Sequence, residues 1–104
     1  MPMYKAQEVL YQLEDVYHEV GRQESLWGVQ KHPDGTGGPE WAELAELAKK
    51  ETDEAEENGT QTWANILKEE FTEVMAADNV RDLLPELTQL AAVCMSWVRD
   101  INDR

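Results

Sequence analysis

The stretch LKEEFTEVM, residues 67–75, has the spacing of an amphipathic helix, but two of its acids fall on the apolar side. At about 100° of rotation per residue, Leu67 and Val74 gather on one face, and Glu70 and Glu73 lie within that same face. A buried carboxylate without a partner is costly, so it must be protonated, paired with a basic side chain or bound to a cation. The sequence therefore predicts a helix whose inward acids need partners.

Ordinary structural explanations for these two acids remain open. A basic side chain could pair with them, or the helix could be rotated enough to expose them to water. The candidates for pairing are Lys68, Arg81 and Arg99.

A second helix is predicted further along the chain, over about residues 83–101. Pro85 is tolerated in its first turn if Asp82 is the N-cap. Its middle, LTQLAAVCMSWV at residues 87–98, is apolar almost all round, which indicates a helix with neighbours on several sides. To cover all its apolar sides, this helix needs more neighbouring helices than one chain of this length readily supplies. We therefore expect oligomerisation, as a homodimer or a homotetramer.

This second helix also carries two oxygen-bearing side chains three residues apart, Glu86 and Gln89, at the edge of its apolar stripe. Two antiparallel helices that each offer such a pair would form a small cage of oxygen ligands. Oxygen ligands suit Mg²⁺, a hard cation that keeps several waters, and the pattern offers no histidine or thiolate ligands for zinc, iron or copper.

The rest of the chain is also predicted to be helical. Apolar residues recur at helix spacing over residues 3–25 and, more weakly, over residues 39–56. The glycine- and proline-rich segment 27–39 between them is predicted to be a loop. Thr60 or Thr62 can cap the helix that contains the acidic stretch. The fold class is therefore all-α, a four-helix bundle.

Length and charge restrict the domain organisation and the partners. A chain of 104 residues predicts a single domain, 1–104. The net charge of −13 argues against binding to nucleic acid or to anionic membranes, and no apolar run is long enough to span a bilayer. Acids occur too early for a signal peptide, so a cytoplasmic location is expected. The lone Cys94 excludes a disulfide within the chain.

Two segments resemble a known family when read together. KEEFTEVMAA, residues 68–77, and ELTQLAAVC, residues 86–94, resemble the paired EExxE and ExxD signature of the all-α, MazG-like nucleoside triphosphate pyrophosphohydrolases. RQESLWGVQKHPDGTGG, residues 22–38, is similar to an upstream segment of small MazG-like proteins, and TWANILKEE, residues 62–70, leads into the acidic motif in the same way.

The resemblance implies an Mg²⁺-binding helical bundle, with Mn²⁺ as the alternative ion, that cleaves a nucleoside triphosphate between its α and β phosphates. It implies two catalytic acids, Glu69 and Glu70, with Glu69 a ligand or the group that orients the attacking water. The metal ligands would be Glu70, Glu73, Glu86 and Gln89. Gln89 departs from the family pattern, which has aspartate there; its amide oxygen can bind Mg²⁺ but is uncharged and a poorer base.

The loop supplies candidate substrate contacts, Trp27, Lys31 and His32, which would touch the nucleotide if the loop closes over it. Composition alone also fits a simple linker, with Trp27 as hydrophobic cover. Other functions remain open as well. A catalytically degenerate MazG-like protein could bind a nucleotide or a basic protein partner, and a purely structural bundle would have to pair its inward acids with basic residues.

Overall fold

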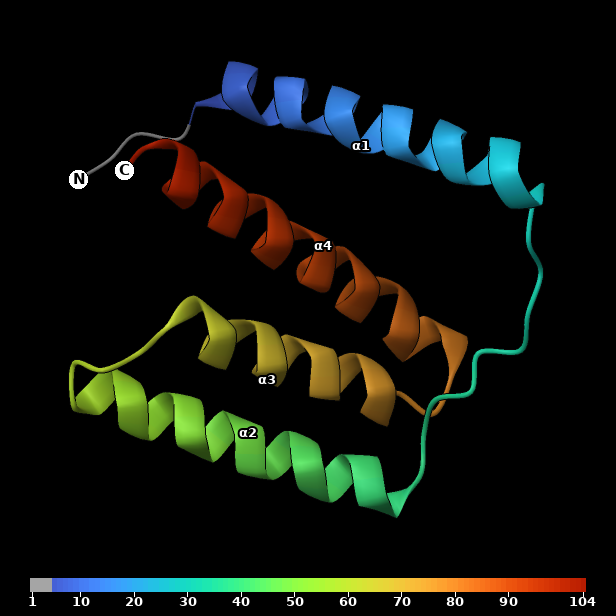
Figure 1. Cartoon of the computed structure of the whole chain (residues 1–104). Coiled ribbons are helices and arrows are strands. Elements are labelled where there is room, and N and C mark those ends of the chain that lie inside the picture. Colours follow the sequence, from blue (N-terminus) through green and yellow to red (C-terminus); the bar gives the residue numbers. More distant parts are fainter. Residues whose placement is uncertain (1–4) are drawn as a thin grey trace. The chain divides into compact units, whose positions relative to one another are not determined.

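The computed structural model describes residues 5–104, which form four α-helices and no strands. The helices are α1 (Ala6–Trp27), α2 (Pro39–Glu57), α3 (Trp63–Ala76) and α4 (Val80–Asn102) (Figure 1). The all-α prediction is therefore confirmed. None of these helices combines the length and hydropathy that a bilayer-spanning segment requires.

The chain divides into two compact units, one up to Asp34 and the other from Gly35 to Arg104. The first unit contains α1, and the second contains α2, α3 and α4. The prediction of a single domain stays a prediction.

Helix α1 continues two residues past its predicted end and reaches Trp27; its predicted start at residue 3 lies outside the described residues. Gly28 ends the helix with φ +71, and its N–H donates to the carbonyl oxygen of Glu24 over 2.7 Å. A positive φ is easily adopted by glycine because it has no Cβ. None of the α1 residues is buried.

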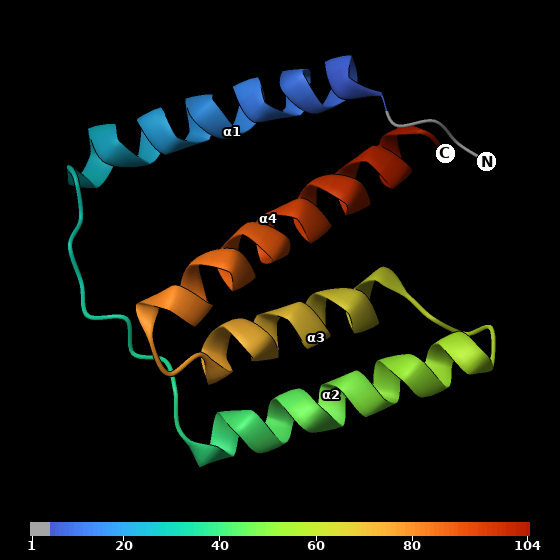
Figure 2. The same cartoon turned by 180° about the vertical axis from the view of Figure 1, so that it is seen from behind.

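In the second unit, α3 lies between α2 and α4 and packs against both (Figures 1 and 2). Residues 28–38 contain no helix, as the composition predicted. The end of this segment is held against the C-terminal end of α3, since the N–H of Gly37 donates to the Met75 carbonyl over 2.8 Å. The N–H of Gly38 likewise donates to Asp78 Oδ1 over 3.2 Å.

Side chains at the helix N-termini set where α3 and α4 begin. Of the two threonines predicted as caps, Thr62 is the N-cap of α3, and it forms a reciprocal capping box with Asn65. For α4 the predicted N-cap, Asp82, is wrong. Asn79 caps the helix instead, because its Oδ1 accepts from the backbone N–H of Asp82 over 2.9 Å.

The earlier start of α4 places Pro85 inside the helix rather than in its first turn. Proline has no N–H, so the carbonyl of Arg81, four residues earlier, loses its helical donor there. The predicted helix boundary was late because Pro85 favoured Asp82 as the cap, whereas Asn79, three residues earlier, caps the helix.

The buried part of the second unit is small. A buried threonine links α2 to α3, since Thr52 Oγ1 donates to the Asn65 carbonyl over 3.2 Å. Within the second unit α4 packs against α3, and Leu83 is its one buried residue. The buried apolar residues of residues 5–104 are Ala48, Val74, Ala77 and Leu83.

Candidate metal centre

Three glutamates converge between α3 and α4. Glu70 and Glu73 lie one turn apart on α3, and Glu86 faces them from α4; one carboxylate oxygen of each lies within 4.8 Å of the other two. All three side chains are half-buried. Over residues 5–104 they form the one group of at least three histidines, cysteines or acids with this spacing. The structure thus brings together three of the four predicted ligands.

No ion pair is described between the three carboxylates and a basic side chain of residues 5–104. Lys68, a candidate for neutralising them, pairs instead with Glu51 of α2 over 3.2 Å. None of the ion pairs described for residues 5–104 includes any of the three glutamates. Glu70 Oε2 and Glu86 Oε2 are buried and accept no hydrogen bond. Pairing with lysine or arginine therefore does not explain why these acids point inward.

Crowding changes the protonation of the cluster. The pKa of Glu70 is raised to about 8. Burial is the largest cause, followed by its contact with Glu86 and the charge of Glu73. Burial also raises the pKa of Glu73, with the charge of Glu86 as the next cause. Two ionised carboxylates have no proton to share, so the contact becomes favourable only when a proton or a cation lies between them. The arrangement fits a hard cation with oxygen ligands.

Glu69 lies to one side of this cluster. It does not belong to the group of converging carboxylates in the described chain. Its surroundings are on α2: burial raises its pKa, the charge of Asp53 raises it further, and the Thr52 hydroxyl and Lys49 oppose this. Consecutive helical residues point about 100° apart, which separates Glu69 from Glu70. The implied catalytic role of Glu69 stays a prediction.

Gln89 is exposed on α4, one turn after Glu86. Its amide is uncharged, so the three glutamates supply all of the negative charge that the predicted ligand set contains. Its role as a ligand stays a prediction.

The three predicted substrate contacts belong to the first unit. Trp27 is the last residue of α1, and Lys31 and His32 lie in the connecting segment; all three are exposed. The His32 imidazole is hydrogen-bonded through Nε2 to Gln30 Oε1 over 2.9 Å. Their contact with substrate stays a prediction.

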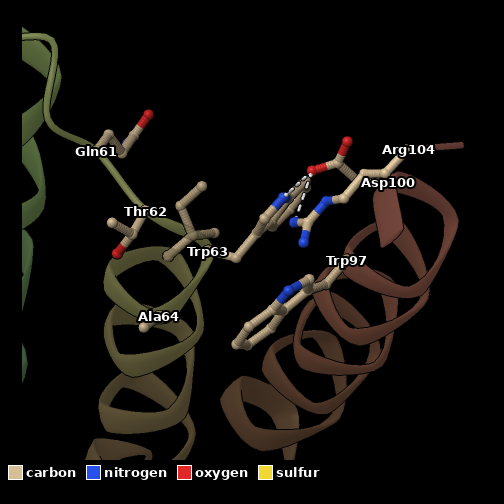
Figure 3. Close-up of a pocket in the computed structure, with 8 residues that line it drawn as sticks. Gln61, Thr62, Trp63, Ala64, Trp97, Asp100 and Arg104 are labelled. Atoms are coloured by element: carbon tan, nitrogen blue, oxygen red, sulfur yellow. Dashed lines mark hydrogen bonds and ion pairs between the residues drawn. The ribbon is translucent and has the colours of Figure 1, made fainter. Parts of the chain in front are cut away.

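An aromatic pair in the second unit was not predicted from the sequence. Trp63, at the start of α3, and Trp97, near the end of α4, have nearly parallel rings with an interplanar angle of 12° and centroids 6.5 Å apart (Figure 3). The sequence feature that could have predicted this pair is the antiparallel hairpin of α3 and α4. In such a hairpin the start of the first helix lies near the end of the second, which brings Trp63 towards Trp97.

Comparison with known proteins gives no relative for this chain: no protein-family model, no curated protein and no solved structure matches it. The MazG-like resemblance therefore rests on the sequence motifs alone. The site has to be interpreted from the geometry and charge of its own residues.

Proposed function

We propose that this protein is an Mg²⁺-dependent nucleotide pyrophosphohydrolase, with Mn²⁺ as a substitute ion. It would cleave a ribo- or deoxyribonucleoside triphosphate to the monophosphate and pyrophosphate. The observation that carries the proposal is the group of three half-buried carboxylates within 4.8 Å of one another, none of them in an ion pair with lysine or arginine among the described residues.

The residues present fit a divalent cation. Glu70, Glu73 and Glu86 would each give one oxygen, and the rest of the coordination would be left for water and phosphate. Bound Mg²⁺ would offset the repulsion between the acidic site and an anionic substrate, polarise a phosphoryl oxygen and acidify a bound water. Glu69, at the α2 side of the cluster, would orient the attacking water.

The test is product analysis with the full chain, Mg²⁺ or Mn²⁺, and each common nucleoside triphosphate. We expect pyrophosphate to be released, EDTA to stop the release, and Glu70→Ala and Glu73→Ala each to abolish it. Glu43→Ala is the matched control, since Glu43 is an exposed glutamate of α2. Orthophosphate as the sole direct product would exclude cleavage between the α and β phosphates.

One observation favours a second candidate function, in which the chain is a catalytically degenerate MazG-like protein that binds a nucleotide or a basic protein partner. Gln89, where the family pattern has aspartate, is uncharged and exposed. The net charge of −13 also suits a basic partner. Absence of turnover on all nucleotides, with no activity gained in Gln89→Asp, would support this candidate.

We also propose that the chain self-associates, as a dimer first. The support is the apolar surface left open on the second unit, where Phe71 of α3 and Leu87 of α4 are 44% and 45% exposed. Between α3 and α4 lies an apolar hollow lined by Leu67, Phe71, Leu90 and Cys94, among others. Surfaces of this kind are commonly covered in oligomers.

Sedimentation velocity tests the self-association. We expect a species larger than the 11.9 kDa chain, and we expect Leu87→Glu to shift it towards monomer. Glu43→Ala again serves as the control and should leave the species unchanged. A wild-type protein that sediments as a monomer at high micromolar concentration would contradict the proposal.

A further inference from the structure

We propose that Trp63 and Trp97 form a slot for a planar nitrogen heteroaromatic ring, of the kind found in nucleobases. The slot lies in a hollow of about 570 Å³ at the end of the α3–α4 hairpin away from its turn. Figure 3 shows the two indoles beside Asp100 and Arg104 of the C-terminal end of the chain. Nothing in the carboxylate cluster is needed for this inference.

The spacing of the two rings is the first observation. Centroids 6.5 Å apart are at the long end of the range for two aromatic rings in direct contact, about 4.5 to 7 Å, so the indoles gain little from each other. A flat guest needs about 3.5 Å of contact distance on each side, about 7 Å in all. Moving the two nearly parallel indoles apart to this spacing would admit one planar ring with an indole on each face.

The arrangement of the two rings argues against an ammonium cation as the guest. A tetrahedral ammonium group is thicker than a flat ring, so the two indoles would have to separate further to enclose it. The two rings are also nearly parallel, at 12°, rather than arranged as walls of an aromatic cage around a cation.

The polar rim of the hollow is the second observation. Trp63 Nε1 donates to Asp100 Oδ2 over 2.7 Å, and Arg104 Nη2 lies 3.4 Å from the same oxygen. These contacts lower the pKa of Asp100, the Trp63 hydrogen bond being the main cause, so it stays ionised. Asp100 Oδ1 takes part in neither contact, and Trp97 Nε1 donates none of the hydrogen bonds described for residues 5–104.

These groups select the chemistry of the guest. Asp100 Oδ1 can accept a hydrogen bond, while Trp97 Nε1 and the Arg104 guanidinium can donate. A ring whose edge carries both donors and acceptors would use both kinds of group, and a hydrocarbon ring would use neither. Nitrogen heteroaromatic rings such as nucleobases have such edges.

The slot is separate from the carboxylate cluster. Along α3, Trp63 precedes Glu70 by about 10 Å, and along α4, Trp97 follows Glu86 by about 16 Å, at 1.5 Å per residue. A molecule without phosphate or metal can therefore probe the slot alone.

The experiment is a titration followed by the indole N–H signals in ¹H–¹⁵N NMR spectra, on the wild-type full chain in EDTA. Each signal is assigned with a single Trp→Phe variant. Adenosine and cytidine are the heteroaromatic probes, and choline is the ammonium probe. We expect saturable shifts of the Trp63 and Trp97 signals with a nucleoside, and no shift of either with choline.

Trp41 provides an internal control. It belongs to the same unit and also has an aromatic neighbour, but its ring meets that of Phe71 at 85°, so no parallel slot exists there. Its signal should not move. Trp97→Leu should weaken nucleoside binding by about tenfold or more, whereas Trp41→Leu should leave the affinity unchanged.

Several results would overturn the proposal: no saturable shift with either nucleoside, shifts confined to Trp27 or Trp41, or choline acting at lower concentration than the nucleosides. The wild-type titration decides these outcomes even if Trp97→Leu fails to fold, which circular dichroism would reveal. Because EDTA is present and no phosphate is offered, the result is independent of whether the carboxylates bind metal or support hydrolysis.

Discussion

Removing the charge of Glu70 should stabilise the metal-free protein at alkaline pH. Burial and the neighbouring acids raise the pKa of Glu70 from 4.5 to about 8. In this interval the folded state holds a proton on Glu70 that the unfolded state has released. The wild-type protein therefore has no penalty from Glu70 below about pH 4.5, loses stability as the pH rises through this interval, and carries the full loss above about pH 8.

The size of the effect follows from this pKa. At 1.36 kcal/mol per pH unit, the difference from the ordinary value sets an upper limit of about 5 kcal/mol. Water reaches the half-buried cluster and screens its charges, so we expect a loss of about 2 kcal/mol between pH 5 and pH 8. Glu70→Gln keeps the size of the side chain and lacks the charge, so it should remove most of this loss.

Urea denaturation in EDTA at several pH values between 5 and 8 measures these free energies of unfolding. Glu43→Gln is the control, and it should retain the wild-type decline. Added Mg²⁺ should restore stability at pH 8 in the wild type and much less in Glu70→Gln. The reasoning is refuted if the wild-type and Glu70→Gln profiles run parallel across this range.

Three further changes test other parts of the structure. Thr62→Ala removes the N-cap of α3 and should lower the free energy of unfolding by about 1 kcal/mol in urea denaturation, with an unchanged m-value. Gly37→Ala should lower the melting temperature by several degrees, because the residue has φ +96 and its new Cβ would lie 2.8 Å from Asp78 Oδ1; an unchanged melting temperature would contradict the described loop. Gln89→Asp should tighten Mg²⁺ binding on the order of tenfold in isothermal titration calorimetry if residue 89 lies near the ion, and equal affinities would remove it from the ligand set.

The local sequence was enough to predict which segments are helical. Apolar spacing and the glycine–proline segment gave four helices, and α2 ends within one residue of its predicted end. The start of α4 was predicted wrongly because two residues three positions apart can each cap this helix. Asn79 and Asp82 are both good N-cap residues, and which one serves depends on how the turn after α3 is built.

The candidate site was partly predictable because helical periodicity fixes which side chains share a face of one helix. Helical periodicity places Glu70 and Glu73 on one face, which is a property of α3 alone. That Glu86 meets them depends on the register between α3 and α4. This meeting was predicted from the two pairs of oxygen ligands and from the family resemblance, whereas helical periodicity does not fix the register. The orientation of Glu69 towards Asp53 was not predicted, because it depends on α2 packing against the other side of α3.

By itself, the sequence determined the helices, their apolar faces and the presence of acids on one of those faces, because these follow from interactions within a few residues along the chain. The tertiary structure decided that three carboxylates share one small volume, with no ion pair to them among the described lysines and arginines, and that Trp63 lies nearly parallel to Trp97. Those facts depend on the register and rotation of one helix against another. Packing between distant residues sets both, and helical periodicity does not encode them.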